Sequence, residues 1–386
     1  MPDNRKKPTL QEQVDQLMER FEEVNDFYIT KVAEQIRAIG ELTPSSMSRI
    51  AIMAQMNRDI AEINRKIAQA VQMAVPDVYK IYQRALDDLY YDPRFERALK
   101  ETPLSDASKR RLEQFVRSVS RQTAGTMQNL SNTTIVSQTY RRTVDNAVLA
   151  VSTGLTDYRS ATRESVRSLG YEGLQLTYPS GYHRRLDTAI RQNVLDGAKQ
   201  IAQHGSDIMG EELGYDAVEI SVHAMSAPDH EPIQGRVFLK EEFEKMQSGQ
   251  SFVDVDGRRY DAIRRPIGQW NCMHFAMSFS TLYSVRKYTD AQLAALAEAN
   301  ASGCEINGRH LSLYRCSQTM RELETQVRRE MEAANAAKAA GDTELRKDCQ
   351  RRINALNRRY LDLCKASGLK PRRERMYVRG FKMVKV

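Results

Sequence analysis

Histidine and cysteine side chains gather in two segments near the middle of the chain. His223 and His230 lie in the first segment, just after a stretch that alternates like a strand, and Cys272 and His274 lie in the second. These four side chains offer nitrogen and sulfur donors in the number that a tetrahedral zinc site uses. The spacing is not that of a standard zinc finger, so the fold would have to bring the two segments together. A structural zinc site is therefore one hypothesis for this region.

A plainer interpretation of the same region needs no metal. Polar side chains can hold two loops together by hydrogen bonds alone. On this interpretation the side chains that brace the loops are Asp229, Gln234, Trp270 and Asn271. Both interpretations predict that the two segments meet, and they differ in whether an ion lies between them.

A catalytic interpretation is the third alternative. A metal-dependent hydrolase or nuclease centred on the same His/Cys cluster would need an open coordination position and a general base, for which Asp229 or Glu231 qualifies. Cys272 as a nucleophile paired with His274 is disfavoured, because we expect side chains two residues apart in an extended segment to splay. The sequence contains no Walker loop and no G-x-G-x-x-G, G-x-S-x-G, H-E-x-x-H or C-x-x-C motif. We therefore assign no catalytic residue.

Charged side chains form two further groups. Arg184, Asp187 and Arg191 lead into a predicted helix at spacings that place them on one face, where a row of ion pairs is expected. The net charge of +8 is concentrated at the C-terminal end, where residues 351–386 contain 12 Lys or Arg and 2 Asp or Glu. Cations of this tail could contact DNA phosphates or an acidic partner surface. The candidates are Arg372, Arg373, Arg375, Arg379 and Lys382.

Composition excludes some classes of protein. The 386 residues are 41% hydrophobic and 28% charged, a balance that suits long exposed helices better than one dense globule. No apolar run is long enough to cross a bilayer, and the polar, basic first segment does not resemble a secretory signal. We therefore expect the chain to be made in a cytoplasm, with its five cysteines as free thiols.

Apolar spacing predicts helix over most of the first half. Between residues 10 and 39, apolar side chains recur every three or four positions, as on one face of a helix. A second helix with the same spacing follows Pro44, and Pro76 is expected to open a shorter helix that ends near Tyr91. Further helices are predicted over 105–130, 132–153 and 156–169, the last ended by Gly170. Long, narrow apolar stripes of this kind favour helical hairpins, within one chain or between copies.

The middle of the chain carries the β content. After a helix over 183–213, the segments 217–222, 236–239 and 251–255 read as short strands, and Asp256-Gly257 reads as a hairpin turn. Thr289 is the expected N-cap of a short helix, and 316–340 and 342–367 are expected to form a hairpin around Gly341. We predict a mainly α protein with a small α+β module, long helical hairpins in the N-terminal half and a C-terminal helical hairpin.

Six segments of the sequence bear on its classification. They are 185–194 (RLDTAIRQNV), 219–223 (EISVH), 227–237 (APDHEPIQGRV), 268–274 (GQWNCMH), 288–289 (YT) and 314–318 (YRCSQ). In this order they resemble the phage minor capsid protein 2 family, which is related to the head morphogenesis proteins typified by protein F of phage Mu. The family's asparagine–cysteine–basic–histidine signature is present at 271–274, with Met273 where an arginine is usual.

This resemblance implies a low-copy structural protein of a tailed-phage or prophage head, assembled near the portal and acting in head morphogenesis, DNA packaging or ejection. It implies portal and major capsid proteins as partners, and we add self-association and phage DNA as expectations, without a membrane partner. The expected location is the virion, in the head interior or at the portal vertex, after assembly in the host cytoplasm. A metal-dependent enzyme and a DNA-binding packaging factor remain the alternatives. We divide the chain into a helical region (1–172), an α+β core module (173–285), a helical hairpin (286–368) and a basic tail (369–386).

Overall fold

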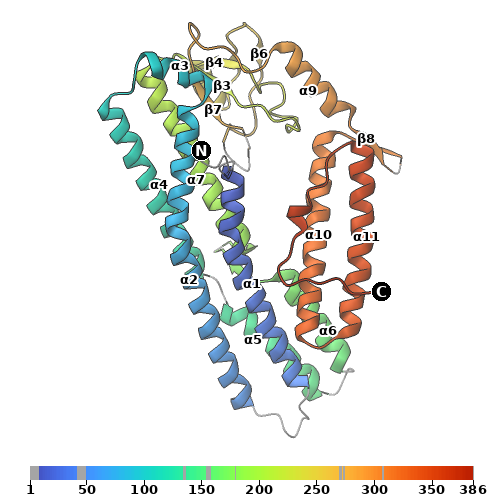
Figure 1. Ribbon diagram of the computed structural model, residues 1–386. Coiled ribbons are helices and arrows are strands. Elements are labelled where there is room, and N and C mark those ends of the chain that lie inside the picture. Colours follow the sequence, from blue (N-terminus) through green and yellow to red (C-terminus); the bar gives the residue numbers. More distant parts are fainter. Residues whose placement is uncertain are drawn as a thin grey trace, which may run out of the picture. The chain divides into compact units, whose positions relative to one another are not determined.

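The computed structural model describes residues 8–40, 49–133, 136–153, 158–178, 180–268, 272, 274–306 and 308–385. Over these residues the chain forms eleven α-helices and nine short strands (Figure 1). The predicted fold class, mainly α with a small β-containing module, is confirmed.

The elements follow one another in the order helices, a strand-rich middle, and helices again. The helices are α1 (Leu10–Gly40), α2 (Arg49–Tyr90), α3 (Pro93–Glu101), α4 (Asp106–Thr133), α5 (Val136–Thr153), α6 (Tyr158–Glu172), α7 (Leu186–Glu212), α8 (Lys240–Gln247), α9 (Asp290–Ser302), α10 (Leu313–Ala339) and α11 (Thr343–Ser367). The strands are β1 (Gln175–Thr177), β2 (His183–Arg185), β3 (Ala217–Ile220), β4 (Val237–Leu239), β5 (Phe252–Val253), β6 (Arg259–Tyr260), β7 (Ala276–Phe279), β8 (Cys304–Ile306) and β9 (Arg309–Leu311). No helix among the described residues is long and apolar enough to cross a membrane.

The chain divides into two compact units, each assembled from separate stretches of sequence. Unit 1 comprises Met1–Asp77, Ala124–Asn193 and Thr319–Val386, and unit 2 comprises Val78–Thr123 and Val194–Gln318. Four long helices, α2, α4, α7 and α10, contribute residues to both units. The sequence analysis divides the chain into consecutive segments instead. Changes in composition along a chain do not show which distant helices pack together.

The core of unit 1 is built on α1. Its apolar face is buried at the predicted spacing of three and four residues, as at Phe21, Tyr28 and Val32, and the helix packs against α5 and α6. Gly170, expected to end a helix, lies inside α6. A Cβ at that position would lie 2.3 Å from Cα of Ala333 in α10. The glycine therefore permits a close approach of two helices.

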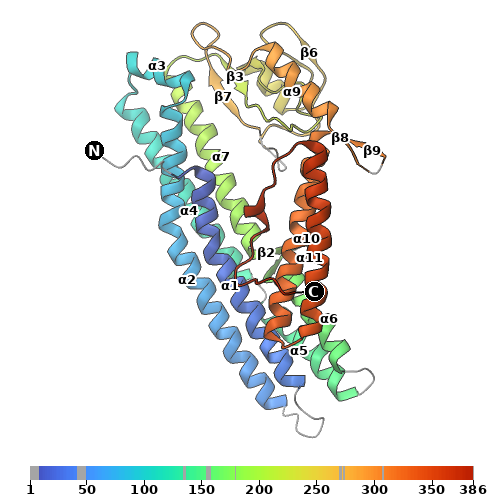
Figure 2. The same ribbon diagram turned by 45° about the vertical axis from the view of Figure 1, so that its right-hand side comes forward.

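The predicted C-terminal hairpin is confirmed. Asp342 caps α11 by accepting the N–H of Leu345 at 2.8 Å, and α10 and α11 run side by side in both views (Figures 1 and 2). The hydroxyl of Tyr360 donates to Glu324 at 3.0 Å across the hairpin. Gly368 ends α11 in the left-handed conformation.

The predicted break at Pro76 is wrong. Helix α2 runs through this proline without ending. The buried face continues on both sides of it, with Val71, Ala74 and Val78 all protected from solvent. Packing of a continuous apolar face therefore outweighs the backbone hydrogen bond that a proline removes.

Unit 2 contains a three-stranded antiparallel sheet in the order β4-β3-β7. The predicted strands around β3, β4 and the β5–β6 hairpin are present, whereas β7 is a strand that the sequence does not predict. Phe238 of β4 packs its ring edge-on against Phe252 of β5 and Tyr260 of β6. Thr289 caps α9 with a complete capping box, as predicted.

Candidate functional site

Three of the four predicted donor residues come together in unit 2. The sulfur of Cys272 lies 3.3 Å from Nδ1 of His230 and 3.7 Å from Nδ1 of His274. One donor atom from each residue lies within 4.8 Å of the others, and all three side chains are buried. The cluster therefore joins the loop after β3 to the segment that enters β7.

Local backbone structure explains how these side chains converge. His230 lies in a tight turn, where its N–H donates to the carbonyl of Ala227 at 3.0 Å. The N–H of His274 donates to the sulfur of Cys272 at 3.3 Å, so these two residues face the same cluster. The expectation that their side chains splay is wrong, because Nδ1 of His274 lies 3.7 Å from the sulfur of Cys272.

Each histidine of the cluster has an oxygen partner on its second ring nitrogen. Nε2 of His230 lies 2.6 Å from the carbonyl oxygen of Arg265. Nε2 of His274 lies 3.3 Å from the hydroxyl of Ser226. These contacts aim both Nδ1 atoms at the sulfur of Cys272.

The cluster favours a thiolate. Burial alone would raise the pKa of the Cys272 thiol, but hydrogen bonds with His230, His274 and nearby backbone groups lower that pKa to about 5. Burial opposes the protonated form of His230, yet its bonds to Cys272 and to the carbonyl of Arg265 raise its pKa. An ionised sulfur is the form that binds metals and that attacks electrophiles.

His223 lies beside this cluster and not in the group of three. Its ring meets the ring of His274 edge-on, with centroids 4.6 Å apart. Its backbone N–H donates to the side chain of Gln234 at 2.9 Å, so Gln234 braces the loop as the hydrogen-bonding interpretation expects.

The two carboxylates considered as general bases have other partners. Asp229 forms an ion pair with Arg265 at 3.0 Å, and Glu231 accepts a hydrogen bond from Asn300 of α9 at 2.6 Å. Both contacts brace the loop. The two remaining residues of the predicted bracing set, Trp270 and Asn271, lie outside the described residues.

One face of α7 supports the same region, which the sequence analysis missed. Lys199 donates to the carbonyl of Cys272 at 3.1 Å, and Gln203 accepts the N–H of Ala276 at 3.0 Å. Ser206 accepts the N–H of Ser278 at 2.7 Å. The spacing of these three residues places them on one side of a helix, where they satisfy the outer edge of β7. Polar residues at helical spacing usually mark a solvated face, so no sequence signal separates them.

The predicted row of ion pairs loses its first member, and its other two residues pair with charges outside the row. Arg184 lies in β2, because α7 begins only at Leu186. Asp187 pairs with Arg185 at 2.9 Å, and Arg191 pairs with Asp15 of α1. The charges are therefore used to join elements within unit 1.

The basic tail lies along the helices of unit 1. Arg372 pairs with Glu324 at 2.8 Å, and Arg379 lies 3.4 Å from Glu23. The other three candidate cations, Arg373, Arg375 and Lys382, are exposed. Contact of the tail with DNA remains a prediction.

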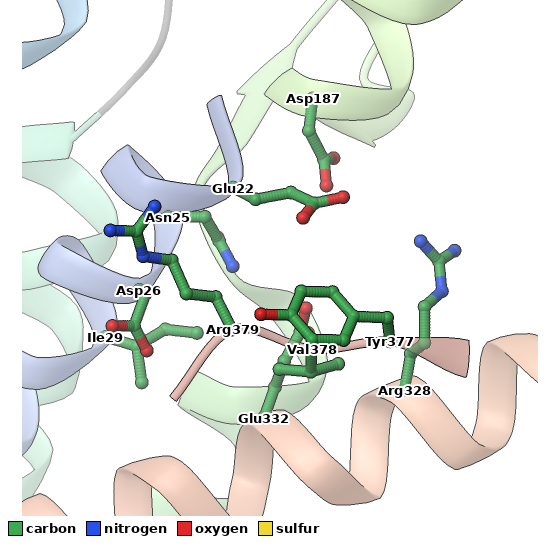
Figure 3. Close-up of a pocket in the computed structure, with 10 residues that line it drawn as sticks. All are labelled: Glu22, Asn25, Asp26, Ile29, Asp187, Arg328, Glu332, Tyr377, Val378 and Arg379. Carbon is green, nitrogen blue, oxygen red and sulfur yellow. The ribbon is translucent and has the colours of Figure 1, made fainter. Parts of the chain in front are cut away.

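A small cavity lies where the tail meets α1 and α10 (Figure 3). Glu22 and Asp26 of α1 line it together with Asp187, Glu332 and the tail residue Tyr377. Its volume of about 20 Å³ suffices for water and not for an organic ligand. Figure 3 shows the carboxylates of Glu22 and Asp187 turned toward each other.

Among the described residues of unit 2, the most exposed large apolar side chains lie in one loop after β7, the apolar loop (Leu282, Tyr283 and Val285). Their exposed fractions are 80%, 81% and 84%. The loop is nevertheless well held: Ser280 accepts the N–H groups of Leu282 and Tyr283 through its hydroxyl at 3.3 Å, and Asp216 accepts the N–H of Thr281 at 2.9 Å. It presents apolar side chains to solvent on a fixed backbone.

In a comparison with known protein families, the chain matches one family model. A family model described as phage minor capsid protein 2 matches residues 6–364, nearly the whole chain. No curated protein and no solved structure matches the chain significantly.

Proposed function

Since this chain belongs to the phage minor capsid protein 2 family, we propose that it acts in head morphogenesis near the portal vertex. In this role it is a low-copy part of the phage head that binds neighbouring structural subunits. Membership in a capsid family makes the chain a virion component with a structural role, and it makes other phage structural proteins its partners. The portal is the partner that we propose first, and the major capsid protein is the second.

The apolar loop is the observation that carries this proposal. Leu282, Tyr283 and Val285 project from a hydrogen-bonded turn, so little conformational freedom is lost when a partner covers them. Contiguous apolar side chains exposed on a soluble surface mark interaction sites, and aromatic residues dominate the binding energy of interfaces. The loop therefore suits insertion into an apolar pocket of another subunit.

Charges around the loop favour a fixed orientation in such a contact. Arg286 pairs with Asp256 at 3.2 Å and with Asp290 at 3.0 Å. These groups form a polar border next to the apolar side chains, as at protein interfaces with an apolar centre and a polar rim.

Binding to purified portal rings tests the proposal. We expect the wild-type chain to cosediment with portal rings, and Leu282→Asp/Tyr283→Asp to lose at least tenfold in affinity, because two carboxylates would enter an apolar pocket. Tyr91→Ser is the matched control, since Tyr91 is an exposed aromatic residue (75%) outside the loop. Equal binding by all three proteins would contradict the role of the loop.

Self-association and the major capsid protein are distinguished in the same assay. Sedimentation of the chain alone reports association between copies, and capsid assemblies without portal report the second partner. If the loop substitution left portal binding unchanged but abolished self-association or binding to capsid assemblies, the loop's partner would be a second copy or the major capsid protein and not the portal.

Two other functions have less support. The side chains of His230, Cys272 and His274 are buried among the described residues, which favours a structural role over hydrolysis. A part in DNA packaging or ejection rests on the tail, where Arg372 and Arg379 already have carboxylate partners. Deleting residues 371–386 should leave the salt dependence of DNA binding unchanged if the tail does not contact DNA.

A further inference from the structure

We propose that His230, Cys272 and His274 bind a zinc ion that fastens the loop after β3 to the segment entering β7. The proposal concerns the interior of unit 2 and does not depend on attachment through the apolar loop. It rests on the spacing of the donor atoms, the tautomer of His230 and the partners of the two imidazoles.

The spacing of the donors fits a tetrahedral ion. Zinc binds thiolate sulfur at about 2.3 Å and imidazole nitrogen at about 2.0–2.1 Å, so two such ligands at a tetrahedral angle lie roughly 3.5 Å apart. The two distances from sulfur to Nδ1, 3.3 Å for His230 and 3.7 Å for His274, fall on either side of that value. Two edges of a coordination tetrahedron therefore already have nearly the length that zinc requires.

The tautomer of His230 also suits a metal ligand. Nε2 of His230 faces a carbonyl oxygen, which can only accept, so this nitrogen carries the proton and Nδ1 of the neutral ring is a bare lone pair. Nδ1 of His230 therefore presents a lone pair to the sulfur of Cys272 at 3.3 Å, and Nδ1 of His274 lies 3.7 Å from the same sulfur. One divalent cation satisfies the sulfur and both nitrogens at once.

The outer contacts of both imidazoles also suit metal ligands. Histidines that bind metals usually donate their other ring N–H to a carbonyl, a carboxylate or another oxygen, which fixes the tautomer and the ring orientation. His230 has the carbonyl of Arg265 in this place, and His274 has the hydroxyl of Ser226. Lys199 further holds the carbonyl of Cys272. The donors are thus oriented by neighbours that the ion itself would not touch.

The donor set selects zinc among common cations. One sulfur and two imidazole nitrogens suit a borderline-soft ion and not magnesium or calcium, which prefer oxygen. In the part of the chain that the structure describes, no further His, Cys, Asp or Glu joins the group, so these three residues are the ligands that we assign. Because the site is buried, we assign the ion a structural role.

Metal content and cobalt spectroscopy test the proposal on the full chain, produced without a polyhistidine tag. We expect about one zinc per chain by elemental analysis, in keeping with a single site of this donor set. After exchange into cobalt, we expect a thiolate-to-cobalt charge-transfer band and the visible absorption of a tetrahedral centre. Chelation should lower the melting temperature, and zinc but not magnesium should restore it.

Two substitutions locate the site. Cys272→Ser should abolish the charge-transfer band and the bound zinc, whereas Cys349→Ser should keep both, because Cys349 is a buried cysteine of α11 outside the donor group. If Cys272→Ser does not fold, His274→Gln and cobalt titration of the wild-type chain answer the same question. A folded wild-type chain without zinc and without a cobalt–thiolate band would overturn the proposal, as would zinc that remains bound in Cys272→Ser.

Discussion

The guanidinium of Arg94 lies 2.9 Å from the buried carboxylate of Glu219 and so ties α3 to β3, the central strand of the sheet. Glu219 also accepts the backbone N–H of Lys287 at 2.9 Å, just beyond the apolar loop. Asp92 holds the guanidinium from its other side at 2.7 Å. One carboxylate therefore connects the sheet, a helix and the end of the loop that we propose as the attachment surface.

Breaking the Arg94–Glu219 ion pair should destabilise the chain more than breaking an exposed ion pair. Arg94→Met would leave the carboxylate of Glu219 buried without its cation, a change that typically costs about 3–5 kcal/mol. Urea denaturation should report that loss. Arg97→Met on the same helix is the control, because the Arg97–Glu101 pair is exposed and should contribute little. Similar urea denaturation midpoints for the two variants would refute a stabilising role of the Arg94–Glu219 pair.

Two buried tyrosines of unit 1 should respond differently to loss of the hydroxyl. Tyr140 donates to Asp59 at 2.6 Å, so Tyr140→Phe leaves a buried carboxylate short of a donor and should cost about 1–3 kcal/mol. The hydroxyl of Tyr28 is buried and has no hydrogen-bond partner among the described residues. Tyr28→Phe should therefore be neutral or stabilising in thermal melts. The reverse order of the two melting temperatures would show that this hydrogen-bond pattern is incorrect.

Substituting alanine at two helical glycines should change the stability of the chain in opposite directions. A Cβ at Gly197 of α7 would lie 1.8 Å from the hydroxyl oxygen of Tyr82, which bonds to Thr123 at 2.8 Å. Gly197→Ala should therefore destabilise the chain by about 1–3 kcal/mol. A Cβ at Gly125 of α4 would meet nothing within 4 Å, so Gly125→Ala should stabilise by about 0.5–1 kcal/mol. Calorimetry of both variants decides, and a stabilising Gly197→Ala would contradict the close packing of α7.

Glu22 should make the stability of the chain depend on pH. Burial raises the pKa of Glu22 above its ordinary value of 4.5, and the charge of Asp187 adds to the effect. The folded chain then holds a proton on Glu22 at pH values where the unfolded chain has lost it, so this group lowers stability as the pH rises above 4.5.

Glu22→Gln should consequently melt higher than the wild type at neutral pH. The difference should shrink as the pH falls and vanish below 4.5, the ordinary pKa. Glu19→Gln, at an exposed glutamate of the same helix, controls for the loss of one negative charge. A difference in melting temperature that stayed constant with pH would argue against a raised pKa of Glu22 in the folded chain.

The sequence predicted those elements whose signals are local. The stripe that includes Phe21, Tyr28 and Val32 defines α1, because burial of one face sets a helical period. Thr289 and Asp342 mark helix starts correctly, since a cap needs only the next three residues. The sequence failed at Pro76, where contacts on both sides of the proline keep the helix intact.

The candidate site was predictable in its donors and not in its surroundings. His230, Cys272 and His274 stand out because few other histidines and cysteines occur in the chain. The side chains that support them, such as Gln203 and Ser206, carry no pattern that differs from a solvated helix face. Arg184 shows that helix boundaries also limit the prediction. The helix was expected to begin at residue 183, but α7 begins at Leu186, so Arg184 lies in a strand.

The number of copies of this chain per purified phage particle, measured by quantitative mass spectrometry, tests whether the apolar loop attaches the chain to the head. Particles assembled with the wild-type chain or with Tyr91→Ser should contain it at the same low copy number. Particles assembled with Leu282→Asp/Tyr283→Asp should lack it, although the variant is folded and present in the cell. Full incorporation of the loop variant would contradict attachment to the head through Leu282, Tyr283 and Val285.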